Sequence, residues 1–288
     1  MERKQGLDPV VKHIFIEMGL FFVAFLLVII LLCNSCSTEE PAQTTVPTRQ
    51  TELPVETTTE PAPTQDTSPE GIFQAFLQEH GLTRGDYTEQ MLELYEKYPE
   101  TREFILNYPL EKDQPHTPDI SWADRTQGVP LFLQFDSRWG YTEYGYAVGG
   151  ISGCAPTCLS MVAFYLTGNT QYHPAYMMQF SKEDGHVGQN GGTQWTLFSR
   201  GAKNLGFKVE ELPLDGNMLK KRLDKGIPVV LSLGPGDFTE NGHYVVCVGL
   251  EGDMIRVNDP FSRANSEKLW SYEQLEGQIR NLWAISNP

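Results

Sequence analysis

A long apolar run lies near the N-terminus of this chain. Residues 14–33 read IFIEMGLFFVAFLLVIILLC, and only Glu17 and Gly19 interrupt the apolar character. As a helix this run would rise ~30 Å, the hydrocarbon thickness of a bilayer. A cleaved signal peptide would have a shorter apolar region and a small-residue exit site. We therefore expect residues 14–33 to form a transmembrane helix.

The charges that flank this run predict its orientation. Three basic residues precede it, and the first basic residue after it is Arg49. The positive-inside rule then places residues 1–13 in the cytoplasm and everything after Cys36 outside, as a single-pass protein of the cell membrane with an extracellular C-terminal domain. Ser35-Cys36 also resembles a bacterial lipoprotein processing site. A lipoprotein anchored at Cys36 is therefore the alternative, with the rest of the chain again tethered outside.

The next segment has the composition of a spacer. Residues 34–70 are rich in Thr, Pro and Glu and contain no aromatic residue. Such a segment cannot bury enough surface to offset the entropy of ordering, so we expect a disordered linker. Fully extended it would reach ~100 Å. This length suits a domain held away from a membrane within a cell wall.

Composition limits what the remaining chain can do. The sequence of 288 residues is 40% hydrophobic and 11% aromatic, enough for a core. Its 37 acidic and 22 basic side chains give a net charge of −15. Without a basic surface, binding to the phosphate backbone of nucleic acid is not expected. Five cysteines are too few for a disulfide scaffold.

The order of helical and strand-like segments predicts an α+β fold. Residues 71–128 carry helical patterns, with a break at Pro99, and we assign them to a helical N-terminal extension. Residues 129–288 form the main domain, in which helices come first and strands follow. The expected helices are 154–167, 174–183, 194–205 and 216–225, and the expected strands are 227–233, 243–249, 254–258 and 282–286. Helices followed by mostly antiparallel strands are typical of the α+β class.

Cys154 is the candidate nucleophile. It lies near the start of the segment 151–168, which reads as one buried helix with Pro156 in its first turn and Gly168 as its stop. Unpaired N–H groups and the helix dipole at such a position favour thiolate over thiol, the reactive form of cysteine. The alternative is a small buried apolar residue.

His243 is the candidate general base. It opens a nearly continuous apolar strand, where an imidazole would be held rigidly. The alternative is a strand-end histidine that only contacts solvent. The best rival is His186 in DGHVGQNGG, which we interpret as a loop or rim residue.

A hairpin turn at Glu251-Gly252 returns the chain toward His243. The residues around 258–260 must then lie near the imidazole across two paired strands. A two-residue loop places Asn258 on the face of His243, and a three-residue loop places Asp259 there. Either side chain could orient the second ring nitrogen. The residues alone leave both candidates open, and both could instead simply shape the turn before Pro260.

Gln134 is the candidate for oxyanion stabilisation. It precedes Cys154 by twenty residues, and its amide N–H could act together with the backbone N–H of Cys154. The alternative is an ordinary surface glutamine.

Together these pieces resemble a known family. The order Gln, Cys, His, Asp is similar to that of the papain-like cysteine peptidases, most closely the bacteriocin-processing, double-glycine leader type (family thirty-nine). The matching pieces are Gln134 with Trp139, GCAPTCLSM at 153–161, GGTQW at 191–195, GHYVV at 242–246 and NDP at 258–260. The sixteen-residue step from His243 to Asp259 is also similar to the family's spacing, which favours Asp259 over Asn258.

The resemblance implies a papain-like fold over residues 129–288 and a cysteine peptidase that acts on peptides or proteins. In that mechanism Cys154 attacks the carbonyl, and His243, oriented by Asp259, holds the proton and later gives it to the leaving amine. Gln134 and the Cys154 N–H would bind the oxyanion. Two other readings stay open: a catalytically silent relative that binds peptide or cell-wall material, and an amidase or endopeptidase that cleaves peptidoglycan stem peptides.

The remaining cysteines and the spacing of possible ligands predict no further chemistry. Cys158 and Cys247 are expected to be free buried thiols. The folded part contains no H-E-x-x-H and no paired C-x-x-C, so we expect neither a metal nor a cofactor. We expect a monomer.

Overall fold

The computed structural model describes residues 66–121 and 124–288, all of which belong to one compact unit, Pro63–Pro288. The transmembrane helix expected at 14–33 and nearly all of the linker expected at 34–70 lie outside the described residues. Within the described ranges, no helix is both long and apolar enough to cross a bilayer. The first described helix begins at Pro69, inside the segment assigned to the linker. Ser68 caps this helix by accepting a hydrogen bond from the N–H of Gly71.

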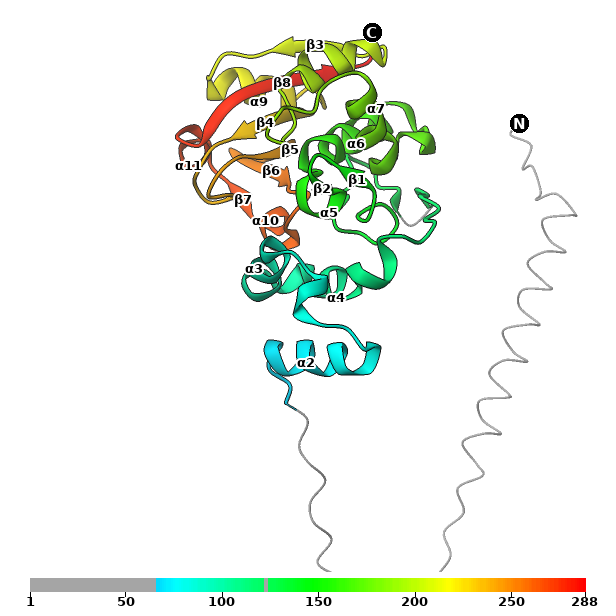
Figure 1. The fold of residues 1–288 in the computed structure, drawn as a ribbon. Coiled ribbons are helices and arrows are strands. Elements are labelled where there is room, and N and C mark those ends of the chain that lie inside the picture. Colours follow the sequence, from blue (N-terminus) through cyan, green and yellow to red (C-terminus); the bar gives the residue numbers. More distant parts are fainter. Residues whose placement is uncertain (1–65, 122–123) are drawn as a thin grey trace, which may run out of the picture. The chain divides into compact units, whose positions relative to one another are not determined.

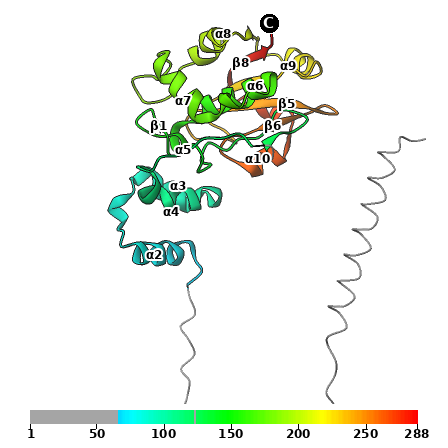
Figure 2. The same cartoon turned by 90° about the vertical axis from the view of Figure 1, so that its right-hand side faces the viewer.

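The extension is helical, as predicted, and it is folded onto the rest of the unit. Its elements are α2 (Pro69–His80), the 3₁₀ turn η1 (Arg84–Asp86), α3 (Glu89–Lys97), the 3₁₀ turn η2 (Pro99–Thr101) and α4 (Arg102–Glu111). The predicted break at Pro99 separates α3 from α4. Phe73, Tyr95 and Phe104 share a buried cluster with Leu133 and Phe135 of the main domain. Figures 1 and 2 show α3 and α4 next to α5 and α10.

The first half of the main domain is a short hairpin followed by helices. Its elements are β1 (Glu143–Tyr144), β2 (Ala147–Val148), α5 (Gly149–Ser152), α6 (Cys154–Thr167), η4 (Thr170–Tyr172), α7 (Pro174–Glu183), the π-helical turn η5 (Leu197–Gly201) and α8 (Ala202–Asn204). The expectation of one continuous helix over 151–168 is wrong, because Gly153 separates α5 from α6. At Gly153 an added Cβ would approach the carbonyl oxygen of Gly149 to 2.5 Å, so the tight junction requires glycine. The predicted stop at Gly168 is confirmed, with a left-handed φ of 66°.

The second half is an antiparallel sheet with helical connections. Its elements are β3 (Lys208–Glu211), α9 (Gly216–Leu223), β4 (Val229–Leu233), β5 (His243–Glu251), β6 (Met254–Asn258), α10 (Arg263–Glu267), β7 (Leu269–Trp270), α11 (Tyr272–Glu276) and β8 (Ile279–Ser286). The strand order is β3-β8-β4-β5-β6-β7, and all pairs are antiparallel. This arrangement is the predicted α+β class.

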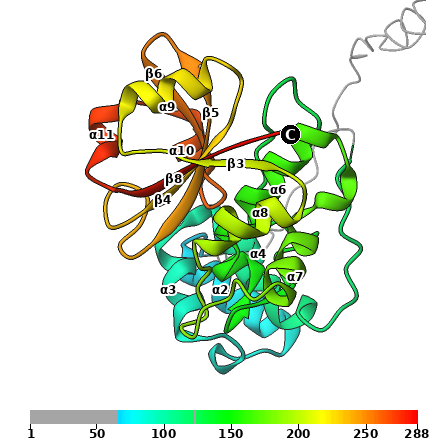
Figure 3. The ribbon, with the colours of Figure 1, turned by 90° about the horizontal axis from the view of Figure 1, so that it is seen from above.

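The two faces of the sheet are covered by different helices. Leu159 and Val162 of α6 pack in one cluster with Val230 and Val246 of the sheet. The opposite face buries Leu219 and Leu223 of α9 in a second cluster. In Figure 3, α6, α7 and α8 lie on one side of the strands and α9 on the other. The sheet therefore holds the start of β5 rigidly beside the helix that begins with Cys154.

Candidate active site

Cys154 is the first residue of α6, as predicted. Gly153 occupies the N-cap position, and Pro156 lies in the first turn. The side chain of Cys154 is partly exposed, whereas Cys158, one turn further along, is completely buried. The first N–H groups of a helix have no acceptor within the helix and point toward its start. The sulfur therefore lies where backbone dipoles favour a negative charge.

His243 is the first residue of β5 and is only 7% exposed. Its Nε2 donates a 2.7 Å hydrogen bond to Oδ1 of Asp259. Burial of the ring disfavours the protonated form, but the charge and hydrogen bond of Asp259, together with the side chain of Cys154, outweigh burial and raise the pKa of His243 to about 10. The imidazole is thus oriented by a carboxylate on one side and placed to exchange a proton with the thiol on the other.

A β-bulge decides which side chain meets the imidazole. The turn between β5 and β6 consists of Gly252 and Asp253, because Glu251 pairs with Met254. In regular pairing, this turn would place Asn258 on the face of His243. The register shifts by one residue between Cys247 and Gly249, which leaves Val248 unmatched. The shift moves Asp259 onto the face of His243 instead. The expected turn at Glu251-Gly252 is therefore wrong by one residue.

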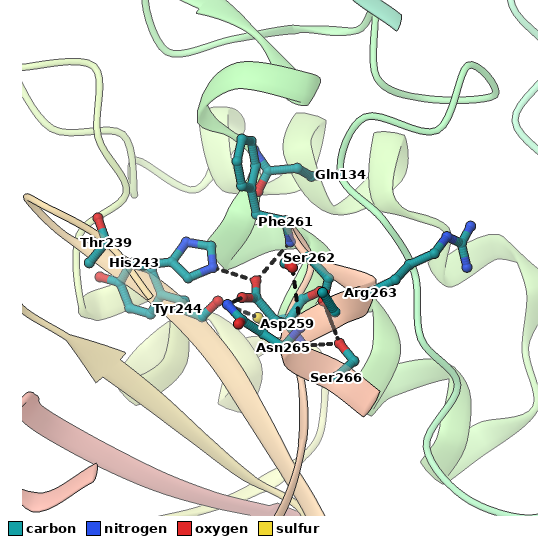
Figure 4. A network of polar contacts seen from close by, with 12 residues as sticks. Gln134, Thr239, His243, Tyr244, Asp259, Phe261, Ser262, Arg263, Asn265 and Ser266 are labelled. Atoms are coloured by element: carbon teal, nitrogen blue, oxygen red, sulfur yellow. Dashed lines mark hydrogen bonds and ion pairs between the residues drawn. The ribbon is translucent and has the colours of Figure 1, made fainter. Parts of the chain in front are cut away.

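Asp259 is fixed by several hydrogen bonds and is 1% exposed. Its Oδ1 also accepts from the backbone N–H of Phe261 at 2.8 Å, and its Oδ2 accepts from Nδ2 of Asn265 at 2.9 Å. The backbone N–H of Asp259 donates to Oγ of Ser266 at 2.9 Å. Figure 4 shows these groups converging on Asp259 from the turn of α10, opposite His243.

The sequence reasoning missed Phe261, Asn265 and Ser266. A signal for their helix was present, because Ser262 caps α10 by accepting from the N–H of Asn265. That local signal predicts a short helix, but it does not indicate that the helix folds back onto Asp259.

Asn258, the alternative orienting residue, has a different role. Its Nδ2 donates to the carbonyl oxygens of Val129 and Pro130 at 3.0 and 2.9 Å. The segment that leads to Gln134 is therefore tied to the end of β6.

Gln134 lies in the same site and is 2% exposed, so the surface reading is wrong. Its backbone N–H donates to the carbonyl oxygen of Pro260 at 2.8 Å, and its Nε2 donates to that of Gly150 at 3.0 Å. The Gly150 contact orients the amide and uses one of its two N–H groups. Oε1 is buried and has no hydrogen-bond partner among the described residues. The second N–H of the amide is left for a further acceptor.

Cys154, His243 and Gln134 line one cleft of about 630 Å³. One wall comes from the β1–β2 turn and residues 190–192, another from the loop 238–242, and a third from α3 of the extension. A larger cavity of about 810 Å³ lies along α4 and includes none of these three residues. The smaller cleft is therefore the candidate active site.

The other singled-out groups lie outside this cleft. His186 is in a loop, as expected, but it is completely buried, so its placement at a rim is wrong. Its ring nitrogens contact Oγ1 of Thr196 and Oδ2 of Asp184 at 2.8 and 2.7 Å. Cys158 and Cys247 are free and buried, as expected, and belong to the clusters on opposite faces of the sheet. No group of three or more potential metal ligands occurs within 66–121 and 124–288.

A cysteine at a helix start, facing a buried histidine–carboxylate pair across one cleft, is the arrangement of enzymes with a nucleophilic thiol, a class that includes the cysteine-type peptidases. Residues 126–287 match the model of the peptidase C39-like family. The chain belongs to this family and is a cysteine-type peptidase.

Solved structures similar to this chain include three peptidases of low identity. The peptidase domain of Streptococcus ComA, a bifunctional ABC transporter of a quorum-sensing pathway, is 21% identical, with 55% of this chain and 98% of that chain covered and a TM-score of 0.40. A double-glycine motif protease from an AMS/PCAT transporter, in complex with its leader peptide, is 17% identical, with 59% and 99% covered and a TM-score of 0.38. A C39-like peptidase from Bacillus anthracis is 19% identical, with 59% and 98% covered and a TM-score of 0.35. No curated protein matches the chain.

Proposed function

We propose that this protein is a membrane-anchored extracellular peptidase that hydrolyses peptide bonds with a Cys154–His243–Asp259 triad. The observation that carries the proposal is the 2.7 Å bond from the buried His243 to Asp259, in the cleft that contains Cys154. A buried imidazole with a carboxylate behind it and a thiol before it is the arrangement that generates a thiolate–imidazolium pair. The raised pKa of His243 favours the imidazolium partner of that pair.

The first half of the reaction forms an acyl-enzyme. The Cys154 sulfur attacks the scissile carbonyl carbon, and the C–N bond breaks as the imidazolium of His243 donates its proton to the leaving amine. Asp259 keeps Nε2 of the imidazole engaged, so that the other ring nitrogen faces the sulfur and the substrate. Because α6 holds Cys154 and β5 holds His243 in the same cleft, the two reacting side chains are already in place before the attack.

The backbone N–H of Cys154 and the side-chain amide of Gln134 stabilise the oxyanion. The backbone N–H of Cys154 points from the start of α6, and the second N–H of the Gln134 amide is not used by Gly150. Two donors aimed at the developing negative charge lower the barrier to its formation.

The second half of the reaction releases the acyl group. Neutral His243 takes a proton from water as the water oxygen attacks the thioester carbonyl, the C–S bond breaks, and the acid product leaves with the thiolate–imidazolium pair restored. No group other than water and the residues already described is required.

The substrate is a peptide or protein segment that can enter the cleft in extended form. The double-glycine motif protease among the similar structures was solved with a leader peptide bound. Glycines at 191, 192 and 242 line the cleft of the present chain, so a peptide backbone can approach closely there.

The apolar run at 14–33 supports the proposed location. We propose that it anchors the chain in the cell membrane, with the peptidase outside and residues 34–65 as part of the spacer. A lipid anchor on Cys36 would give the same arrangement. Mass spectrometry of the intact chain recovered from membranes distinguishes the two anchors, because lipidation adds mass and processing removes the residues before Cys36.

Labelling and hydrolysis together test the proposed function. A haloacetamide should label Cys154 at neutral pH, and His243→Ala should abolish that labelling, whereas Cys158→Ala should leave it unchanged. Cys154→Ala should abolish the release of new amino termini from a peptide mixture. Full hydrolysis by Cys154→Ala would exclude the proposal, and absence of labelling in the wild type would indicate a silent binding protein. If only purified cell wall is digested, the enzyme is a stem-peptide amidase or endopeptidase.

A further inference from the structure

The corner between α3 and α4 contacts the loop that carries Asp259. This α3–α4 corner comprises Lys97 to Glu100. The carboxylate of Glu100 accepts hydrogen bonds from Oγ of Ser262 at 3.0 Å and from the backbone N–H groups of Arg263 and Ala264 at 2.9 and 3.4 Å. Glu100 and Ser262 are 162 residues apart in the chain. A side chain of the extension thus holds the first turn of α10.

The other side of α10 holds Asp259. Asn265 donates to Oδ2 of Asp259, and Ser266 accepts from its backbone N–H. α10 has only five residues, and a helix this short is not stable on its own. Its position must therefore come from contacts with other elements, and Glu100 supplies three of them. Figure 4 shows Arg263 pointing away from Asp259, so its side chain does not contribute on that side.

An aromatic contact also joins the α3–α4 corner to the loop that carries Asp259. The ring of Tyr98 packs edge-on against Phe261, with ring centroids 5.1 Å apart and planes at 85°. Phe261 donates its backbone N–H to Asp259, and its ring lies edge-on to the imidazole of His243, with centroids 6.4 Å apart. The corner therefore contacts both the loop that carries Asp259 and Phe261, which itself contacts His243 and Asp259.

A third contact involves only exposed groups. Lys97 pairs with Glu240 in the loop before His243, and both side chains are at least half exposed. Such surface pairs contribute little because water and salt screen them. Glu100 is therefore the residue of the corner on which the geometry depends.

We propose that Glu100 is a positioning residue of the peptidase: through α10 and Asn265 it holds Asp259 in the orientation that His243 requires. The inference rests on the proposed function, because it assigns Glu100 to the same triad. It also assigns a role to the extension, which would serve as a structural part of the active site. Loss of the Glu100 contacts would let α10 shift, and a small displacement of Asp259 weakens its control of the imidazole.

The test compares alkylation of Cys154 in four forms of the full chain, kept in detergent. They are the wild type, Glu100→Ala, Glu100→Gln and Glu103→Ala. Glu103 is exposed on α4, so its substitution removes the same charge without touching α10. The rate of reaction with iodoacetamide is measured against pH, and mass spectrometry of the Cys154 peptide separates this thiol from the other four. The titratable groups that act on His243 are Asp259 and Cys154, and none of these variants changes them.

We expect Glu100→Ala to slow alkylation at neutral pH by ~10-fold to 100-fold, the range that follows from misplacing a catalytic group by up to ~1 Å. The rates should converge at alkaline pH, where a thiol ionises without help. Glu100→Gln keeps a carbonyl acceptor and should recover part of the loss, and Glu103→Ala should match the wild type. In an Asp259→Asn background, Glu100→Ala should add nothing, because both changes act on the same group.

Several results would overturn the inference. One is a Glu100→Ala protein whose Cys154 is alkylated at the wild-type rate over the whole pH range. Another is a Glu100→Ala substitution that slows alkylation as much in the Asp259→Asn background as it does alone. If the wild type itself reacts like an unassisted thiol, the proposed function fails and this inference fails with it. Near-ultraviolet circular dichroism reports folding. If Glu100→Ala is unfolded, Glu100→Gln, which keeps the size of the side chain and removes its charge, takes its place, with the same outcomes deciding.

Discussion

Replacing Asp259 with Asn tests the central electrostatic argument. The substitution preserves the size of the side chain and removes its charge. Burial of His243 lowers its pKa, and the charge and hydrogen bond of Asp259 are the main interactions that raise it. Without the charge, burial is opposed less strongly, and the pKa of His243 should fall from about 10 in the direction of its ordinary value of 6.5. The population of the thiolate–imidazolium pair at neutral pH should then decrease.

The size of the effect follows from the nature of the bond that is weakened. A buried hydrogen bond to a charged group contributes roughly 1.5–3 kcal/mol. At about 1.36 kcal/mol for each tenfold change, its loss corresponds to roughly 10- to 150-fold in the population of the ion pair. The rate of alkylation of Cys154 at neutral pH should fall by this factor. Above the range in which an unassisted thiol ionises, variant and wild type should react at similar rates.

The measurement is the pH dependence of iodoacetamide alkylation, with the Cys154 peptide quantified by mass spectrometry. Asp253→Asn is the matched control, because Asp253 lies in the β5–β6 turn with a side chain that is 95% exposed. It should behave as the wild type. An Asp259→Asn protein that is folded and shows the wild-type rate at neutral pH would refute the reasoning, because the charge would then have no role in the ion pair.

Three further predictions follow from the same site. Gln134→Ala should lower kcat by ~10²- to 10³-fold with little change in KM, as removal of an oxyanion donor does; an equal rise in KM would instead indicate a role in binding substrate. Asn258→Ala leaves two buried carbonyl oxygens without their donor and should lower the free energy of unfolding by ~1–3 kcal/mol in urea, while the pH profile of alkylation stays unchanged. Stability should also depend on His243: because its pKa is raised in the folded protein, its contribution is complete below about pH 6.5 and is lost as the pH rises through about 10. The urea midpoint of the wild type should decrease as the pH rises across this range. In a folded His243→Gln variant, the part of this decrease that His243 causes should be absent.

Local signals predicted the longer helices and four of the sheet strands of the main domain, but not the edge strand β3. α6 begins at Cys154 and ends before Gly168 because Pro156 fits a first turn and Gly168 adopts a left-handed conformation at low cost. The strands at 254–258 and 282–286 were predicted because apolar β-branched and aromatic residues dominate them, and both lie within β6 and β8. Short elements such as β7 and α11 were not predicted, since a few residues carry too little pattern.

The choice between Asp259 and Asn258 required the folded sheet. Sequence spacing indicated that one of them meets His243, but the face of a strand changes with every one-residue shift. The turn at Gly252-Asp253 alone would have selected Asn258, and the bulge beside Val248 reversed the outcome. Gly249 lies at the bulge, and a glycine inside a strand is a signal for one, but that signal does not fix how the register shifts. Only the resemblance to a family with the same His–Asp spacing pointed to Asp259 beforehand.

The role of the extension shows how a local signal can have a distant consequence. Pro99 was expected to break the helix, and it does so by ending α3 at Lys97. In an unbroken helix, Glu100 would lie four residues after Glu96 on the same face, and Glu96 is exposed. The break turns the chain so that the Glu100 carboxylate meets the start of α10 instead. A proline that only interrupts a helix in the sequence therefore allows, in the folded protein, the contact that links the extension to the triad.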